Sequence, residues 1–190
     1  MTMPEVAWPR TAGTLTLRPP TSDDLDQVLS WRNRPEVTRW LLRTTVDPEA
    51  FRRAWLTGVD DPNDHSAVAE LDGVIVGTGS LDVCDGMGQF QGDAWRKSEA
   101  LLGYLIDPAH AGNGYATAIA SALLDLAFDE LGVRRVTAGC FADNVASWRV
   151  MEKLGMRREQ HGVRDSWHEE LGWVDGYTYG ILAEEWRGVR

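Results

Sequence analysis

Two glycines, Gly112 and Gly114, stand in a short loop between an apolar segment and a segment of helical character. Glycine adopts positive φ angles at little steric cost, so such a loop can point several backbone N–H groups toward one place. The positive end of the helix that follows lies at the same place, and the two features together bind phosphate. Glycines at a strand-to-helix turn are also common for structural reasons alone. The loop therefore indicates a phosphate site only in combination with other residues.

A second segment supplies polar residues at helical spacing. Asn144, Ser147 and Met151 are separated by three and then four residues, so they lie along one stripe of a helix. Asn144 also fits the role of a helix cap, and a capping asparagine can still face a ligand along this stripe. Within this stripe Ser147 can donate a hydroxyl proton, whereas the thioether of Met151 cannot.

Together the two segments resemble the acyl-coenzyme A site of the GNAT superfamily of N-acetyltransferases. Its pyrophosphate loop reads Gln or Arg, two residues, Gly, one residue, then Gly or Ala; Ala111 stands first here, followed by Gly114 and Ala116. The later segment resembles the family's Asn-x-x-(Ala/Ser) and Glu-Lys-x-Gly pattern. Residues 17–21, 31–37 and 184–186 resemble the ribosomal-protein N-terminal acetyltransferase branch, so the similarity extends from about residue 15 to residue 186.

The resemblance implies acetyl-coenzyme A as cosubstrate. It implies that backbone N–H groups around Leu105, Ile106 and Asp107 meet the pantetheine amides and the thioester carbonyl. It assigns the pyrophosphate to a loop and helix start made of Ala111, Gly112, Asn113, Gly114, Tyr115, Ala116 and Thr117. It also places Asn144 and Ser147 against the cofactor. Because Ala111 replaces a polar residue, a charge-assisted contact is lost, and His110 and Asn113 are candidates for a replacement donor. For His110, a solvent-facing place in the loop is the favoured interpretation.

For catalysis, the resemblance assigns to Ser147 the protonation of the departing thiolate, while Met151 stands where many members have a tyrosine. The general base is expected at Glu99, just before the central strand, acting through water. The family's usual carboxylate falls nearer Leu101, and an exposed carboxylate at a strand start is an equally good interpretation of Glu99. Three further carboxylates stay open as candidates: Glu70, Asp82 and Glu169.

The acceptor site is expected beside Trp31, Asn33 and Trp40, because the resemblance puts this connection next to the acceptor groove. Tryptophans in such places are also often core residues. The acceptor is an amine, either a protein or peptide N-terminus or a small molecule such as an aminoglycoside or a polyamine. A regulatory module that binds acetyl-coenzyme A without turnover is the rival interpretation.

Composition limits the partners. The 190 residues carry a net charge of −10, with 29 acidic against 19 basic side chains, which disfavours nucleic acid and suits a cationic amine. An acidic surface that serves only solubility is an equally good interpretation of this charge. No apolar run reaches the roughly 20 residues that cross a bilayer, so we expect a cytoplasmic protein without a membrane partner. Two distant cysteines, Cys84 and Cys140, predict neither a disulfide framework nor a metal site. A homodimer remains open.

The pattern of elements predicts a mixed α/β, or α+β, protein with the GNAT fold. Residues 1–13 read as a flexible arm and residues 14–190 as a single domain. Asp72 and Gly73 mark a tight hairpin turn, and a glycine-rich loop is expected over residues 82–97. Strands at residues 100–106 and 135–141, joined by a helix over residues 115–131, predict a parallel pair. The result is a mostly antiparallel, twisted sheet with one splayed parallel pair and helices on both faces.

Overall fold

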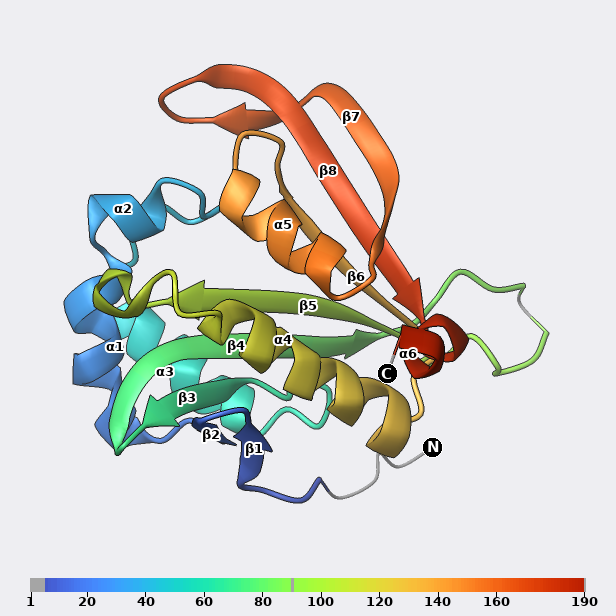
Figure 1. Ribbon diagram of the computed structural model, residues 1–190, viewed down its shortest axis with the longest axis horizontal. Coiled ribbons are helices and arrows are strands. Elements are labelled where there is room, and N and C mark those ends of the chain that lie inside the picture. Colours follow the sequence, from blue (N-terminus) through green and yellow to red (C-terminus); the bar gives the residue numbers. More distant parts are fainter. Residues whose placement is uncertain (1–5, 90, 190) are drawn as a thin grey trace.

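The computed structural model describes residues 6–89 and 91–189, which form an eight-stranded sheet in the order β1-β2-β3-β4-β5-β6-β8-β7 (Figure 1). The strands are β1 (Arg10–Ala12), β2 (Leu15–Arg18), β3 (Ala67–Leu71), β4 (Val74–Cys84), β5 (Glu99–Ile106), β6 (Arg135–Phe141), β7 (Arg157–His168) and β8 (Gly172–Leu182). All neighbouring strands are antiparallel except β5 and β6. The predicted fold class, a mostly antiparallel sheet with one parallel pair, is confirmed.

Helices lie on both faces of this sheet (Figure 1). They are η1 (Ser22–Asp24), α1 (Leu25–Arg32), α2 (Pro35–Thr38), α3 (Pro48–Val59), η2 (Pro108–His110), α4 (Tyr115–Asp125), a π-helical turn η3 (Leu126–Glu130), α5 (Val145–Lys153) and α6 (Ala183–Val189). Asp47 caps α3 by accepting from the Ala50 N–H at 2.8 Å, and Pro48 follows as the first helical residue. Aspartate is a favoured N-cap residue, and proline is favoured at the first helical position.

Helix α4 packs tightly on β4. A Cβ atom added at Gly79 would lie 2.6 Å from Ile119 Cγ2 and 2.7 Å from Leu123 Cδ1, both on α4. One added at Gly77 would lie 3.3 Å from Ile119 Cδ1 and only 2.6 Å from the Leu105 carbonyl oxygen of β5. The two glycines therefore let the helix approach the strand more closely than any larger residue would allow. This contact is part of the main core, and it fixes the position of the helix start that belongs to the candidate site.

The opposite face is covered by α1 and α3. Val28 and Trp31 of α1 form a separate buried cluster with Val68 and Ile75 of the sheet. Exposure of these four side chains is 2% or less. The two clusters hold the sheet between helical layers, so a shift of its central strands would disturb the packing of both cores.

The parallel pair is short. β5 and β6 pair only over residues Glu99 to Leu101, opposite Arg135 to Thr137, and then diverge. β6 continues beside β8 up to Phe141, whereas β5 continues beside β4 to Ile106. A gap therefore opens in the middle of the sheet, between the second half of β5 and the second half of β6.

Some boundaries differ from the predictions. The expected flexible arm is wrong for Arg10–Ala12, which pairs with β2 as β1 and places Ala12 in the core at 5% exposure. Val6 and Trp8 pack against the same core, while residues 1–5 lie outside the described residues. The expected helix over residues 115–131 divides into α4 and the π turn η3. The C-terminal hairpin of β7 and β8 projects from one end of the molecule (Figure 1).

Within the described residues, no helix has the length and apolar character to span a membrane. No group of histidine, cysteine, aspartate and glutamate side chains in the same part of the chain could hold a metal ion. Cys84 and Cys140 are both free thiols.

Candidate active site

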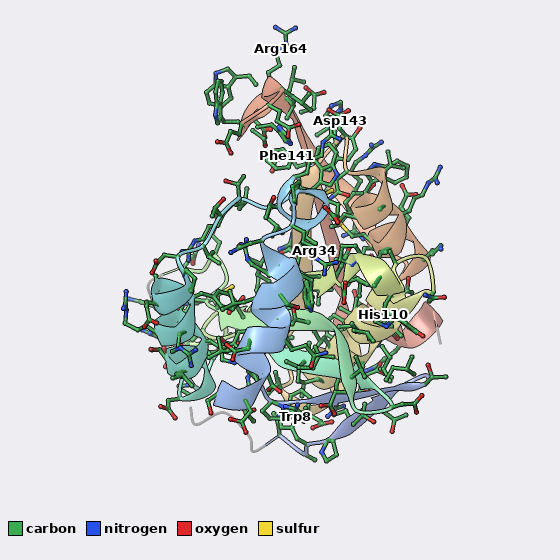
Figure 2. The ribbon with its side chains drawn as sticks, turned by 90° about the vertical axis from the view of Figure 1, so that its left-hand side faces the viewer. Trp8, Arg34, His110, Phe141, Asp143 and Arg164 are labelled. Atoms are coloured by element: carbon green, nitrogen blue, oxygen red, sulfur yellow. The ribbon has the colours of Figure 1, made fainter. Side chains whose placement is uncertain are left out.

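The gap between β5 and β6 forms a cleft of about 790 Å³. It is bordered by β5, the glycine loop with the start of α4, the inward face of α5, and the segment that contains α2. Figure 2 views the molecule from this side, with His110 near the start of α4 and Phe141 below the β7–β8 hairpin. Predicted site residues that line the cleft are Trp40, Leu105, Ile106, Ala111, Gly112, Gly114, Tyr115, Ala116, Thr117, Asn144 and Ser147.

The glycine loop presents free backbone donors. Gly112 and Gly114 have φ angles of 82° and 80°, which are left-handed values that other residues adopt at a cost. Gly114 is the N-cap of α4 and has no side chain to bond the first N–H groups of the helix. In the described part of the chain, the N–H groups of residues 112–117 have no hydrogen-bond partner, and Ala118 is the first to donate within the helix, to Gly114 O at 3.1 Å. Six successive donors at a helix N-terminus match the needs of a diphosphate.

Two predicted residues of this loop shape it without lining the cleft. Asn113 turns back and donates to His110 O at 3.0 Å. Asp107 accepts from the Ala109 N–H at 3.1 Å, while its own N–H donates to Val76 O at 2.9 Å. The prediction that Asp107 offers a backbone donor to the cofactor is therefore wrong, because β4 already uses that donor.

The same bond shows which donors of β5 face the gap. In an antiparallel ladder, residues that bond to the neighbouring strand alternate with residues whose N–H and C=O point away from it. Asp107 bonds to β4 opposite Val76, and so does Leu105 opposite Thr78, whereas Tyr104 and Ile106 point the other way. Since β6 has already diverged, the Tyr104 and Ile106 groups face the cleft. Leu105 lines the cleft, but its N–H belongs to the ladder, which corrects the prediction for this residue.

Ser147 lies on the wall opposite this edge of β5. Its backbone carbonyl accepts a hydrogen bond from the Tyr104 hydroxyl at 2.9 Å, and the two hydroxyl oxygens are 3.2 Å apart. Burial raises the pKa of Tyr104 to about 12, although its hydrogen bond with Ser147 opposes the shift. Burial likewise raises the pKa of the neighbouring Cys140 thiol, again opposed by a hydrogen bond with Ser147. The Tyr104 hydroxyl and the Cys140 thiol are therefore both protonated at neutral pH.

The stripe on α5 lies as its spacing predicts. Asn144 caps the helix by accepting from the Ser147 N–H at 3.2 Å, which leaves its amide NH₂ free to face the cleft. Met151 also lines the cleft and is 1% exposed. Its thioether supplies an apolar wall without a proton.

Glu99 is not placed in the cleft. It is the first residue of β5, at the closed end of the parallel pair and opposite Arg135. Its carboxylate bonds Arg135 at 2.8 Å and lies 3.7 Å from Arg134. The start of the splay is several residues further along the strand, and each residue adds about 3.3 Å. The geometry does not support Glu99 as the general base and indicates an ion pair that closes the strand pair.

The three predicted acceptor residues have different environments. Trp31 is 1% exposed and belongs to the second core cluster, so its assignment to the acceptor groove is wrong. Asn33 is bound to the backbone of Val46 and lies outside the cleft. Trp40 does line the cleft, with its ring centroid 5.2 Å from that of His168 and 6.2 Å from that of Phe141.

The structure also brings residues to the cleft that the sequence patterns did not indicate. For Tyr104, the only sequence signal is its alternation with Leu102 and Ile106. This alternation places the three side chains on one face of a strand, but it does not show which other element that face contacts. Lys153 lines the cleft as well, and so does His110, which the sequence had already offered as a replacement donor for the side chain missing at Ala111. Lys153 is part of the Glu-Lys-x-Gly pattern, which was the signal available for it.

Comparison with known proteins identifies this architecture. Residues 14–157 match the family model described as the acetyltransferase (GNAT) domain. The "uncharacterized N-acetyltransferase YnaD" of Bacillus subtilis is 39% identical over 85 residues, which is 45% of this chain and about half (49%) of that protein's length. A GNAT-family acetyltransferase structure from Bacillus anthracis is 26% identical and has a TM-score of 0.75, with 92% of this chain and 98% of that chain covered.

A further solved structure is the ribosomal-protein-S5-alanine acetyltransferase from Vibrio fischeri. It has a TM-score of 0.77 at 18% identity, with 95% of this chain and 99% of that chain covered, and so it supports the fold. The family match spans about three quarters of the chain and includes the glycine loop, the splayed strands and all of α5. The chain belongs to the GNAT acetyltransferase family, whose cosubstrate is acetyl-coenzyme A.

Proposed function

We propose that this protein is an N-acetyltransferase that transfers the acetyl group of acetyl-coenzyme A to the α-amine of a protein or peptide N-terminus. The observation that carries the proposal is the splay of β5 from β6. It places the free backbone groups of Tyr104 and Ile106, the hydroxyl of Ser147 and the donors of the glycine loop around one cleft.

The cleft can hold the cosubstrate in an extended arrangement. The N–H groups of residues 112–117 bind the diphosphate, and Lys153 and His110 add basic side chains near it. The backbone of Tyr104 and Ile106 pairs with the pantetheine amides as a neighbouring strand would, since that side of β5 has lost β6. Bound acetyl-coenzyme A supplies an activated thioester, and the residues of the cleft hold it in a fixed orientation.

The protein's part in the reaction is to orient donors and move protons. A β5 N–H that faces the cleft stabilises negative charge on the thioester oxygen when the amine attacks the carbonyl carbon. The C–N bond forms and the C–S bond breaks, and Ser147 Oγ donates its proton to the departing sulfur. The proton that the amine loses passes through water to Ser147, so the hydroxyl is restored and the products are the amide and the free thiol. No covalent bond to the protein is needed. An α-amine has an ordinary pKa of about 7.7–8.0, so a substantial fraction is neutral near pH 8 without a strong base.

A peptide N-terminus is favoured by the sequence segments that resemble the ribosomal-protein branch, residues 17–21, 31–37 and 184–186. Trp40 and Leu42 at the edge of the cleft provide apolar surface for such an acceptor, and Leu42 is 93% exposed. The net charge of −10 attracts cationic amines of any kind.

The test is thiol release with a panel of amines. We expect turnover with peptides that begin with Ala, Ser or Met to exceed turnover with polyamines and aminoglycosides. Thiol release without any amine measures hydrolysis and is the control. Turnover confined to a small amine would replace the peptide acceptor, and stabilisation by acetyl-coenzyme A without any turnover would support a regulatory binding module.

A further inference from the structure

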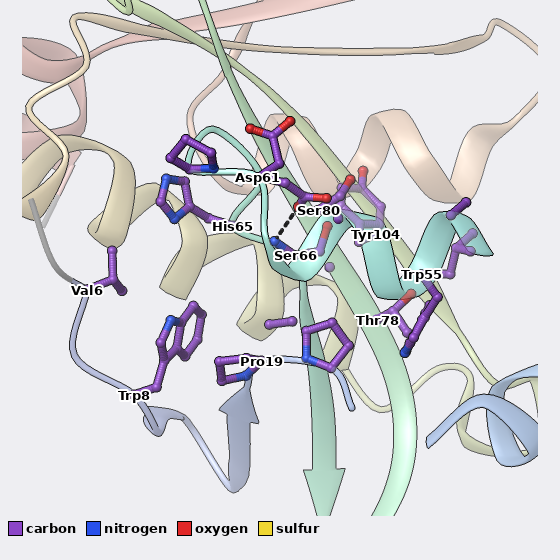
Figure 3. A pocket seen from close by; sticks show the side chains of 18 of the residues that line it. Val6, Trp8, Pro19, Trp55, Asp61, His65, Ser66, Thr78, Ser80 and Tyr104 are labelled. Carbon is purple, nitrogen blue, oxygen red and sulfur yellow. Dashed lines mark hydrogen bonds between the residues drawn. The ribbon is translucent and has the colours of Figure 1, made fainter. Parts of the chain in front are cut away.

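A second cavity, of about 540 Å³, adjoins the cleft. The two share Ser80, Tyr104 and Leu105 as lining residues, so the second cavity opens beside the part of β5 that faces the acetyl group. It extends from there toward α3 and the segment before β3 (Figure 3).

One side of this cavity is apolar and aromatic. Trp8, Pro19 and Trp55 border it (Figure 3), with Phe51 and Ala54 beside them. The Trp55 indole is held in place, because its Nε1 donates to Thr21 O at 2.8 Å. Such a wall suits an aliphatic stem, and its ring faces attract a cation.

The other side carries negative charge. Asp61 and Asp64 line it together with His65, and the described lining includes no lysine or arginine. Asp61 accepts from the Asn63 N–H at 2.8 Å, and Asp64 accepts from the Ser66 N–H at 2.7 Å. These bonds orient both carboxylates without neutralising them, since neither forms an ion pair within residues 6–89 or 91–189.

His65 adds a polar atom that has no partner. Its Nε2 is fully buried and makes no hydrogen bond with any described residue. Burial lowers the pKa of His65 even though Asp64 and Asp61 oppose this shift, so the ring is neutral at pH 7. The neutral ring adds no positive charge to this side of the cavity, so Asp61 and Asp64 set its charge.

We propose that this second cavity binds an ammonium or guanidinium group on an apolar stem, as a second cationic group of the acceptor. The inference rests on the proposed acetyl transfer. The stem lies along the apolar wall that includes Trp8 and Trp55, and the cationic head meets Asp61 and Asp64. One source of this chemistry is a basic side chain near the N-terminus of a peptide, and the other is the distal amine of a linear polyamine.

The required span follows from the strand register. Asp64 pairs with Asp82, which pairs with Leu101, so Asp64 lies two strand spacings from β5, or about 10 Å. Tyr104 is three residues further along β5, roughly another 10 Å at right angles. An acceptor must therefore bridge on the order of 14 Å. An extended peptide advances about 3.3–3.6 Å per residue, so a basic side chain at the second or third position covers this distance.

The experiment compares kcat/KM for matched acceptors. A peptide that begins Ser-Lys-Lys is compared with one that begins Ser-Gln-Gln, and cadaverine is compared with n-pentylamine. We expect a basic acceptor to be preferred by about 10-fold or more, the effect of one charge-assisted hydrogen bond. In the Asp61→Asn, Asp64→Asn double variant the ratio should fall to within about 2-fold. Asparagine keeps an acceptor oxygen for the Asn63 and Ser66 N–H groups.

A matched control removes the same two charges elsewhere. The Asp72→Asn, Asp85→Asn variant changes a hairpin turn and a loop that line neither cavity, and Asp85 also bonds a backbone N–H, that of Lys97. It should keep the wild-type ratio. Thermal unfolding establishes that each variant is folded, and the single variants Asp61→Asn and Asp64→Asn replace the double variant if it is not.

The outcomes separate the two proposals. A preference seen only with peptides identifies the side-chain source, and one seen only with cadaverine identifies the polyamine source. Wild-type protein without a preference in either pair, or a preference that survives in the double variant, overturns the cation site. If no amine yields thiol, the proposed function fails. Calorimetric titration of both basic ligands into the coenzyme A-saturated protein then decides the cation site, and binding that the double variant retains rejects it.

Discussion

The Tyr104 hydroxyl donates to the backbone carbonyl of Ser147 at 2.9 Å and lies 3.2 Å from the Ser147 hydroxyl. The bond joins β5 to α5 across the cleft, so the two walls are held at a set separation. With its own proton committed to the carbonyl, the tyrosine oxygen remains an acceptor for Ser147. Tyr104 therefore acts as a positioning residue for the serine to which we assign the proton transfer.

Removing the two hydroxyls should have coupled effects. Ser147→Ala is expected to lower kcat by about 10- to 1,000-fold, as loss of a general acid does, with little change in acetyl-coenzyme A affinity. Tyr104→Phe keeps the ring and should lower kcat by about 3- to 10-fold, because the serine loses its orientation. The double variant should be no slower than Ser147→Ala. Steady-state kinetics on the four proteins measure this, and strictly additive losses would refute a shared role.

Gly114→Asp should abolish stabilisation by acetyl-coenzyme A, because the new carboxylate would stand where the diphosphate binds. In the wild-type protein, ligand at 100 times its Kd contributes about 2.7 kcal/mol, which raises Tm by roughly 5–10 °C. Gly73→Asp is a matched control, since both glycines have a φ of 80° and open space around an added Cβ. Backbone strain is thereby equal in the two variants, and differential scanning fluorimetry compares their shifts. A full shift in folded Gly114→Asp protein would remove the loop from the site.

Arg32 holds the segment that carries Trp40. Its guanidinium donates to the carbonyls of Arg43 at 2.7 Å and Thr44 at 3.3 Å, and the residue is 6% exposed. Arg32→Gln should raise the acceptor KM several-fold, because freed carbonyls and a loosened segment disturb the cleft edge, at a stability cost of about 1–3 kcal/mol. Arg34→Gln, at an exposed site where the side chain bonds Ser30 O, should leave the acceptor KM and the free energy of unfolding near wild type. Initial-rate kinetics with chemical denaturation tests this, and identical effects of the two variants would contradict it.

Asp24 should make stability depend on acid pH. The residue is 5% exposed, and its carboxylate accepts from Arg18 at 2.7 and 2.8 Å. Burial opposes ionisation, but the bonds from Arg18 and Thr21 outweigh it and hold the pKa of Asp24 below its usual value. A lowered native pKa contributes stability above the unfolded value of about 3.9, and this contribution is lost as pH falls through the native pKa.

Asp24→Asn should therefore lower the free energy of unfolding by about 3 kcal/mol at pH 7, with the difference from wild type narrowing below about pH 4. Asp23→Asn is the control, because Asp23 is exposed and bonds only the Ser22 hydroxyl. Urea titrations from pH 3 to pH 7 provide the measurement. A difference that stays constant across this range would show that the carboxylate's charge is not what stabilises the fold.

Much of the fold and part of the candidate site could be predicted from local sequence. Gly112 and Gly114 indicated a positive-φ loop before a helix, and the spacing of Asn144, Ser147 and Met151 indicated one helical stripe; both features depend only on neighbouring residues. The parallel pair followed from a strand, helix and strand of suitable length. These predictions agree with the backbone angles, the cleft lining and the sheet order.

Tertiary structure decided what each residue faces. Periodicity could not show that Trp31 lies in a core while Trp40 lies at a cleft, because burial depends on elements distant in sequence. Glu99 lies at the start of β5, where the strand still pairs with β6 opposite Arg135, so it does not reach the splay. Tyr104 met Ser147 across 43 positions of chain, and the free donors of β5 depended on where β6 diverged. Local sequence determined the groups available for chemistry, and long-range strand pairing determined which of them share a site.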